Sequence, residues 1–224
     1  MSETTILGVQ FTPVGKIYHF LAPSDTPARE GSFVVVRTSR GQQVGQVKGV
    51  GVKSAIQSDA LQPIERVATD EDLAFKEALG QKEDEALEKV LAYFRRAKLD
   101  NVKPINTEYG FDSNRITFYL NYENDSGFDI KAFLREMSRE FPNFRLEVKQ
   151  VGPRDMAKAI SGFGACGIEK RCCSRFLTEF SSISIKMAKS QDISLTPGEI
   201  TGICGRLRCC LNYEHEQYEE ARKN

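Results

Sequence analysis

The sequence contains no tryptophan and only two histidines, His19 and His215. So few histidines exclude most active sites that use imidazole as a general base, and most metal sites built from several imidazoles. No Ser-His-Asp arrangement, pair of catalytic carboxylates or phosphate-binding glycine loop stands out either. The sequence therefore predicts a protein that is not an enzyme.

Long hydrophobic runs are also missing. No apolar run approaches the length of about 18 residues that crosses a bilayer, and Met1 to Ile6 lack the basic and small-residue features of a secretory signal. We therefore expect a cytoplasmic protein without direct membrane insertion. Because stable disulfides are rare in that reducing compartment, the six cysteines are expected to serve another purpose.

A net charge is missing as well, since Lys and Arg total 31 and Asp and Glu also total 31. The overall charge therefore predicts no polyanionic partner, but its distribution is uneven. Residues 145–210 contain 11 Lys or Arg against 6 Asp or Glu, a balance of +5. This predicts a basic face that suits nucleic acid or an anionic cluster, and that also suits a plain solvated surface.

All six cysteines lie in two similar segments in the last third of the chain. In each segment, a glycine stands two residues before a lone cysteine, a second glycine follows it directly, and a basic spacer leads to a cysteine pair. The first cysteine module is Gly164–Leu177, with Cys166, Cys172 and Cys173, and the second is Gly202–Tyr213, with Cys204, Cys209 and Cys210. We interpret the two modules as an internal duplication.

Cysteine clusters in reducing compartments more often bind metal or perform thiol chemistry than staple a fold. Neighbouring residues of an extended segment point to opposite sides, so we expect one thiolate from each pair to join the two lone cysteines as ligands. Such a set of about four thiolates suits either tetrahedral zinc or a 4Fe-4S cluster. The C-x2-C spacing of zinc ribbons is absent, and the wide glycine-rich, basic loops favour the larger iron–sulfur cluster, with zinc as the alternative.

Other functions remain open at this stage. An RNA-binding module would use the basic face and the rings of Phe163, Phe176 and Phe180, and a thiol redox protein would use a cysteine activated by nearby cations. Six inert, buried cysteines are the plainest alternative. The basic residues that we predict for contacts with a partner or with RNA are Lys170, Arg171, Arg175, Lys186, Lys189, Arg206 and Arg208.

The chain has 224 residues, of which 40% are hydrophobic, so it is long enough to bury a real core. We expect an α+β protein with three domains. Residues 1–62 alternate with period two in short segments around 5–11, 16–20, 33–36 and 44–47, with a hairpin turn at Ser39–Gly41, which predicts a small β-barrel-like sheet. Residues 152–224 predict an irregular, cysteine-rich region.

Residues 63–151 predict a ferredoxin-like domain. A strand at 64–68 precedes a capping box, Thr69 to Asp72, that opens a long helix with an apolar stripe ending at Phe94. Strands at 102–110 and 115–122 follow, then a helix after Asp129 that ends at Pro142, and a last strand at 144–151. The order β-α-β-β-α-β is that of the ferredoxin-like fold, which by itself implies no cluster.

Several of these segments resemble the bacterial RicT (YaaT) family. The resemblance is carried by Val14–Tyr18, by Ser184–Lys189 with Leu195 and Pro197, and by Ile203–Leu207 with the Cys209-Cys210 pair, and it covers nearly the whole chain. It implies a cytoplasmic regulatory protein that joins two small helical partners, RicA and RicF. It also implies that the complex carries iron–sulfur clusters and directs the membrane-anchored endoribonuclease RNase Y in mRNA maturation, with effects on sporulation, competence and biofilm development.

The two modules differ in the length of the spacer. Five residues, Gly167–Arg171, separate the lone cysteine from the pair in the first module, and four, Gly205–Arg208, do so in the second. The family pattern has four. The sequence therefore leaves open whether Cys172 or Cys173 corresponds to the ligand of that pattern.

Overall fold

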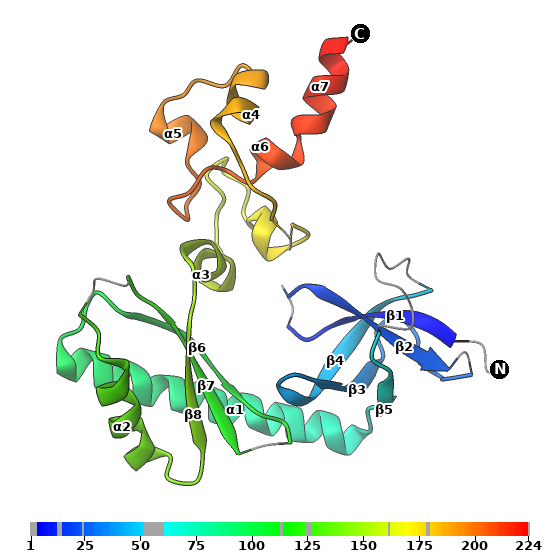
Figure 1. Ribbon diagram of the computed structural model, residues 1–224, viewed down its shortest axis with the longest axis vertical. Helices are drawn as coiled ribbons and strands as arrows, with labels where there is room; N and C mark the ends of the chain where they lie inside the picture. Colours follow the sequence, from blue (N-terminus) through cyan, green and yellow to red (C-terminus); the bar gives the residue numbers. More distant parts are fainter. Residues whose placement is uncertain are drawn as a thin grey trace. The chain divides into compact units, whose positions relative to one another are not determined.

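A computed structural model describes residues 4–12, 15–23, 25–51, 61–112, 114–123, 127–160, 162–177 and 180–223. The chain divides into two compact units, Met1–Gln150 and Val151–Asn224. Figure 1 labels their helices and strands. None of the helices in the described part of the chain is both long enough and apolar enough to cross a membrane.

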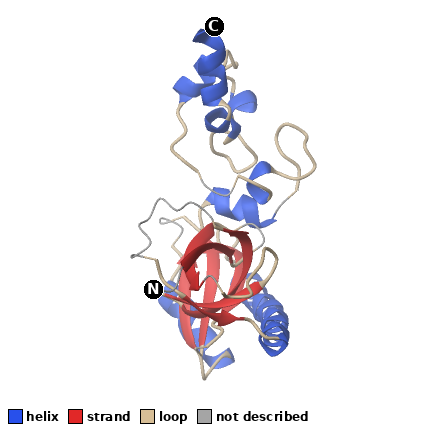
Figure 2. Ribbon diagram, turned by 90° about the vertical axis from the view of Figure 1, so that its right-hand side faces the viewer, coloured by secondary structure: helices blue, strands red, loops and turns tan. Residues whose placement is uncertain are grey.

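The first unit begins with a curled antiparallel sheet, as predicted (Figure 2). Its strands are β1 (Thr4–Gln10), β2 (Ile17–Pro23), β3 (Phe33–Thr38), β4 (Gly41–Val50) and β5 (Ile64–Val67), in the order β2-β1-β4-β3-β5. Alternate side chains such as Leu7, Val9, Val34 and Val36 form its buried core. Thr38 pairs with Gly41, which closes the predicted hairpin, and Gly41 has a φ of +96° that favours glycine.

A second sheet with two helices completes this unit. The elements are α1 (Asp70–Ala97), β6 (Lys103–Tyr109), β7 (Arg115–Asn121), α2 (Ile130–Glu140) and β8 (Arg145–Gln150), and the strand order is β6-β7-β8. Phe94 of α1 and Phe133 of α2 pack with Phe118 of β7 in one core. The predicted helix starts are confirmed, because Thr69 and Asp72 form the capping box of α1 and Asp129 caps α2.

The predicted ferredoxin-like strand order is wrong. Its first strand is β5, which pairs with β3 in the N-terminal sheet through Val34 and Val67, and Ile64 packs in the core of that sheet. Without a strand between them, β7 and β8 pair directly and in parallel. The strand itself was predicted correctly, but the pairing partner of a four-residue strand is set by distant packing that the local sequence does not contain.

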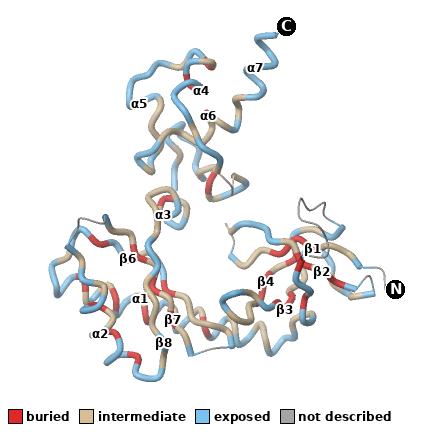
Figure 3. The backbone as a smooth tube through the Cα atoms, in the orientation of Figure 1, coloured by how far each residue is buried: buried red, intermediate tan, exposed pale blue. Residues whose placement is uncertain are grey.

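The second unit, residues 151–224, contains six short helical segments in its described part. These are α3 (Pro153–Ile160), the 3-10 helix η2 (Cys172–Ser174), α4 (Ile185–Ser190), α5 (Pro197–Ile200), α6 (Cys210–Tyr213) and α7 (His215–Lys223). More of this region is therefore helical than the sequence predicts. Its buried residues are few and include Ala157, Cys173, Ala188 and Leu211 (Figure 3). Loops carry both lone cysteines.

Candidate cysteine site

The lone cysteine of the first module lies in a tight turn between two glycines. The Gly167 N–H donates to the Gly164 carbonyl at 3.0 Å, and the Gly164 N–H donates to the Ile168 carbonyl at 2.8 Å. Cys166 is the third residue of this turn. Two backbone hydrogen bonds therefore hold the segment that presents its thiol.

The second module repeats this turn. The Gly205 N–H donates to the Gly202 carbonyl at 2.9 Å, and the Gly202 N–H donates to the Arg206 carbonyl at 2.8 Å. Cys204 again occupies the third position. The duplication seen in the sequence is thus a duplication of backbone hydrogen bonding.

The backbone favours glycine at the last position of each turn. Gly167 and Gly205 have φ values of +85° and +75°, in the left-handed region that costs other residues about 1–2 kcal/mol. A Cβ on Gly164 would lie 3.3 Å from the sulfur of Cys166, and the same atom on Gly202 would lie 3.7 Å from the sulfur of Cys204. Each lone sulfur therefore lies against a glycine backbone.

The arginine before the first cysteine pair connects the module to helix α3. Its backbone N–H donates to the Gly162 carbonyl at 3.1 Å. Its side chain donates from Nε to the Phe163 carbonyl at 3.1 Å and from Nη1 to the Ala157 carbonyl, within α3, at 2.6 Å. Arg171 therefore fixes the start of the cysteine pair to the chain that precedes the turn.

Arg208 makes the equivalent contacts in the second module. Its backbone N–H donates to the Ile200 carbonyl at 2.8 Å, and its Nε donates to the Thr201 carbonyl at 3.3 Å. Its Nη2 donates to the Gly198 carbonyl, within α5, at 2.7 Å. Because the guanidinium groups of Arg171 and Arg208 bind backbone carbonyls, the structure assigns them an internal role, and their predicted contact with a partner or RNA stays a prediction.

This match aligns the two cysteine pairs. Since Arg171 corresponds to Arg208, Cys172 corresponds to Cys209, and Cys173 to Cys210. The N–H of Phe176 donates to the Cys172 carbonyl, and that of Tyr213 donates to the Cys209 carbonyl, each at 3.2 Å. The extra residue of the first module therefore falls between Ile168 and Arg171, before the pair, and does not shift it.

The two modules meet at these equivalent positions. The ring centroids of Phe176 and Tyr213 lie 5.4 Å apart. Burial raises the pKa of Cys209, and the thiols of Cys210, Cys173 and Cys172 add to this effect while Arg154 opposes it, so that the pKa is about 11. Thiols of both modules therefore lie close enough to interact.

A similar link joins the second pair to the first lone cysteine. Burial raises the pKa of Cys210, the Glu214 carboxylate adds to this effect, and Arg208 opposes it. The Cys166 thiol also raises the pKa of Cys210. Five of the six predicted ligands thus interact electrostatically, and Cys204 is the one for which the described residues give no such link.

The six thiols are chemically suited to a thiolate-bound metal, but their positions are not. All six cysteines are free, with Cys173 buried, Cys166 exposed and the other four intermediate, which suits a soft metal chemically. Within the described ranges, however, no three Cys, His, Asp or Glu side chains are grouped closely enough to hold a metal ion. Thiolate donors suit a soft metal, but the distances between these cysteines would have to shorten for them to bind one.

The remaining predicted basic residues lie at the surface. Lys170, Arg175, Lys186, Lys189 and Arg206 are all exposed. Arg154 of α3, which acts on Cys209 from a distant part of the chain, was not among the predicted residues. No spacing rule could have found it, whereas the paired roles of Arg171 and Arg208 were visible as an arginine before each cysteine pair.

Comparison with known proteins places two parts of the chain in the class of PSP1-like proteins. Residues 62–151 match the model described as the PSP1 C-terminal conserved region, and residues 182–224 match that described as the third domain of PSP1-like proteins. The first cysteine module lies between these two regions, and the second lies inside the later one.

A curated relative narrows this class. The stage 0 sporulation protein YaaT of Bacillus subtilis (strain 168) is 38% identical over 221 residues, which cover 97% of this chain and 78% of the relative. The chain therefore belongs to the YaaT (RicT) family of proteins with PSP1 regions. No solved structure matches it.

Proposed function

We propose that this protein is a non-catalytic regulatory adaptor whose two cysteine modules hold a thiolate-ligated iron–sulfur cluster. The observation that supports it most is the repeated turn, with Cys166 and Cys204 at the same position and a cysteine pair fixed by an arginine in each module. The thiols that interact across the modules support it further. The relative's name, a sporulation protein, supports a regulatory role.

The ligands in this proposal are Cys166, Cys204 and one cysteine of each pair. Because the pairs align, the duplicated geometry favours the same member of both: Cys172 with Cys209, or Cys173 with Cys210. A bound 4Fe-4S cluster would supply four iron–thiolate bonds that tie the two modules together. The chain's own part is to present the two lone thiols on turns in which a glycine lies beside each sulfur.

A thiol redox protein is less well supported. A reactive cysteine needs a lowered pKa, because the thiolate is the nucleophile. Burial instead raises the pKa of both Cys209 and Cys210. In the folded chain, these two thiols are protonated at neutral pH, so neither has the activation that a redox cysteine needs.

The adaptor part of the proposal concerns assembly. We propose that the chain joins two small helical partners of the RicA and RicF type in the cytoplasm, and with them directs an endoribonuclease of the RNase Y type in mRNA maturation. Recruitment to the membrane would then occur through the nuclease. Sporulation, competence and biofilm development would be the processes affected. Exposed apolar side chains around the modules, including Ile160, Phe163, Phe176 and Ile203, offer a surface for such partners.

Strictly anaerobic purification tests the cluster directly. We expect bound iron and broad visible absorption for the chain alone or with its two partners, and their loss when all six cysteines are changed to serine. A zinc content without iron would replace the cluster by the zinc alternative. Colourless, metal-free protein in both preparations would reject a metal role for the modules and leave only the adaptor role.

A further inference from the structure

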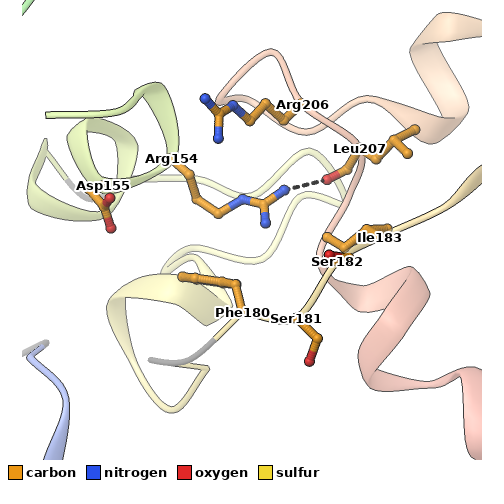
Figure 4. Close-up of a pocket in the computed structure, with 8 residues that line it drawn as sticks. All are labelled: Arg154, Asp155, Phe180, Ser181, Ser182, Ile183, Arg206 and Leu207. Carbon is orange, nitrogen blue, oxygen red and sulfur yellow. Dashed lines mark hydrogen bonds between the residues drawn. The ribbon is translucent and has the colours of Figure 1, made fainter.

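A pocket of about 580 Å³ lies beside the second cysteine module. Residues of helix α3, of the segment between the modules and of the spacer after Cys204 line it (Figure 4). Its polar lining consists of Arg154, Asp155, Ser181, Ser182 and Arg206. A pocket of this size has room for a small ligand such as a nucleotide.

The guanidinium of Arg154 is held in place at the centre of the pocket. Its Nη2 donates to the Leu207 carbonyl at 2.9 Å, and the group lies 4.9 Å from the ring centroid of Phe180. These contacts leave other N–H groups of the same fork for a ligand. Because the side chain is already ordered, a ligand that binds to it loses less conformational entropy.

Arg206 supplies a second positive charge. In Figure 4 its side chain extends back toward α3, while that of Arg154 extends from α3 toward Leu207. The Arg206 side chain is exposed and makes no hydrogen bond or ion pair with the described residues. It differs in this from Arg171 and Arg208, whose guanidinium groups are bound to backbone carbonyls.

The lining favours an anion. Asp155 is the only carboxylate that lines the pocket, and its side chain points away from Arg154 in Figure 4. Ser182 adds a hydroxyl donor to the lining, whereas the Ser181 hydroxyl points away from Arg154 in Figure 4, and Phe180 adds an aromatic surface. Two guanidinium groups with hydroxyl donors are the groups that bind phosphate oxygens most effectively in proteins.

We propose that this pocket binds a phosphate group carried by a nucleotide, either free or within a single RNA strand. Arg154 and Arg206 bind the phosphate oxygens, and the Ser182 hydroxyl completes the contact. No cysteine lines the site, so it requires no cluster. It therefore goes beyond the proposed function and can be tested on metal-free protein.

The test uses the full-length, metal-free chain and a fluorescein-labelled hexauridylate, followed by fluorescence anisotropy at constant ionic strength. Inorganic phosphate and uridine monophosphate are added as competitors. We expect saturable binding that both competitors displace. Arg206→Gln and Arg154→Gln should each weaken binding by about tenfold or more, because a hydrogen bond to a charged group is lost.

Arg135→Gln is the matched control. Arg135 is an exposed residue of α2 in the other unit, and its substitution removes the same charge. We expect it to leave binding unchanged, and circular dichroism to show that Arg206→Gln stays folded. Tighter binding of uridine monophosphate than of the oligonucleotide would identify a free nucleotide as the ligand, and the reverse order would identify RNA. Absence of binding for all three probes, or an equal loss in Arg135→Gln, would overturn the proposal.

Discussion

Phe176 and Tyr213 occupy the same position in the two cysteine modules, four residues after the first cysteine of each pair, and their ring centroids lie 5.4 Å apart. This ring contact joins the halves of the duplication directly. Aromatic pairs of this kind contribute about 0.5–1.5 kcal/mol beyond the area that they bury. The contact therefore stabilises the arrangement that brings thiols of both modules together.

Removal of this ring contact should expose the cysteines. In Tyr213→Ala we expect alkylation of the buried Cys173 to become about two- to tenfold faster, as the loss of an aromatic pair implies. Mass spectrometry after timed exposure to iodoacetamide measures this rate. Tyr218→Ala, an exposed tyrosine on α7, is the control. An unchanged rate in Tyr213→Ala would show that the rings do not hold the modules together.

Arg171 and Arg208 should be needed for the folded modules. Arg171→Ala and Arg208→Ala each remove two side-chain hydrogen bonds to backbone carbonyls, so we expect the unfolding temperature to fall by about 4 °C or more. Lysine should not rescue either position, because it lacks the planar fork. Thermal circular dichroism measures the shift. Arg175→Ala, an exposed change in the same module, should have little effect, and a similar fall there would contradict the assignment.

The turn glycines should be less tolerant than a helical glycine. Gly167→Ala and Gly205→Ala force a side chain into the left-handed region, and we expect each to lower the free energy of unfolding by about 1–2 kcal/mol. Gly80→Ala in α1, where a Cβ meets no atom within 4 Å, should raise it by up to about 1 kcal/mol. Urea unfolding of the three variants measures the difference. Equal effects at Gly80 and Gly167 would be incompatible with the turn geometry.

The cysteines should differ in their effect on bound metal. Cys166→Ser and Cys204→Ser should lose more iron than a single change within either pair, because neither lone cysteine has a neighbouring thiol to replace it. Iron analysis of the six anaerobically purified single variants checks this order. Equal iron content in all six would exclude the proposed ligand set.

Asp72 should make the first unit sensitive to acid. Its hydrogen bonds with Arg66 and Thr69 hold the pKa of the Asp72 carboxyl well below its usual range. Its stabilising contribution is therefore complete above the unfolded-state pKa of about 4, and it is lost as the pH falls toward the folded-state pKa. Urea unfolding between neutral pH and pH 2 should show a smaller loss of stability in Asp72→Asn than in the unchanged chain. An identical pH dependence would mean that the capping box carries no such linkage.

Local signals in the sequence were sufficient for much of the fold. The capping box of Thr69 and Asp72 and the hairpin at Gly41 depend on residues a few positions apart, and both were predicted correctly. The partner of β5 was not, because Val67 pairs with Val34 across a long stretch of chain. Pairing of this kind depends on the core in which Ile64 is buried, and the spacing of apolar residues does not predict that core.

At the candidate site, too, features set by neighbouring residues were predicted and features set by the surrounding fold were not. Duplicated spacing predicted two equivalent cysteine modules, and the matching turns at Cys166 and Cys204 agree with that interpretation. Charge alone could not distinguish Arg208, which binds backbone carbonyls, from Arg206, which lines a pocket, although only Leu207 separates them. The direction in which a long side chain extends is decided by the backbone around it.

The position of β5 also limits how this protein could be divided or recombined. The PSP1 region begins at residue 62, but its first strand, Ile64–Val67, completes the sheet of the preceding segment. A cut at that boundary would leave β3 as a bare edge in one fragment and β5 without a partner in the other. Bare strand edges template aggregation. The two segments are therefore expected to be inherited, expressed and lost together, as a single unit of exchange.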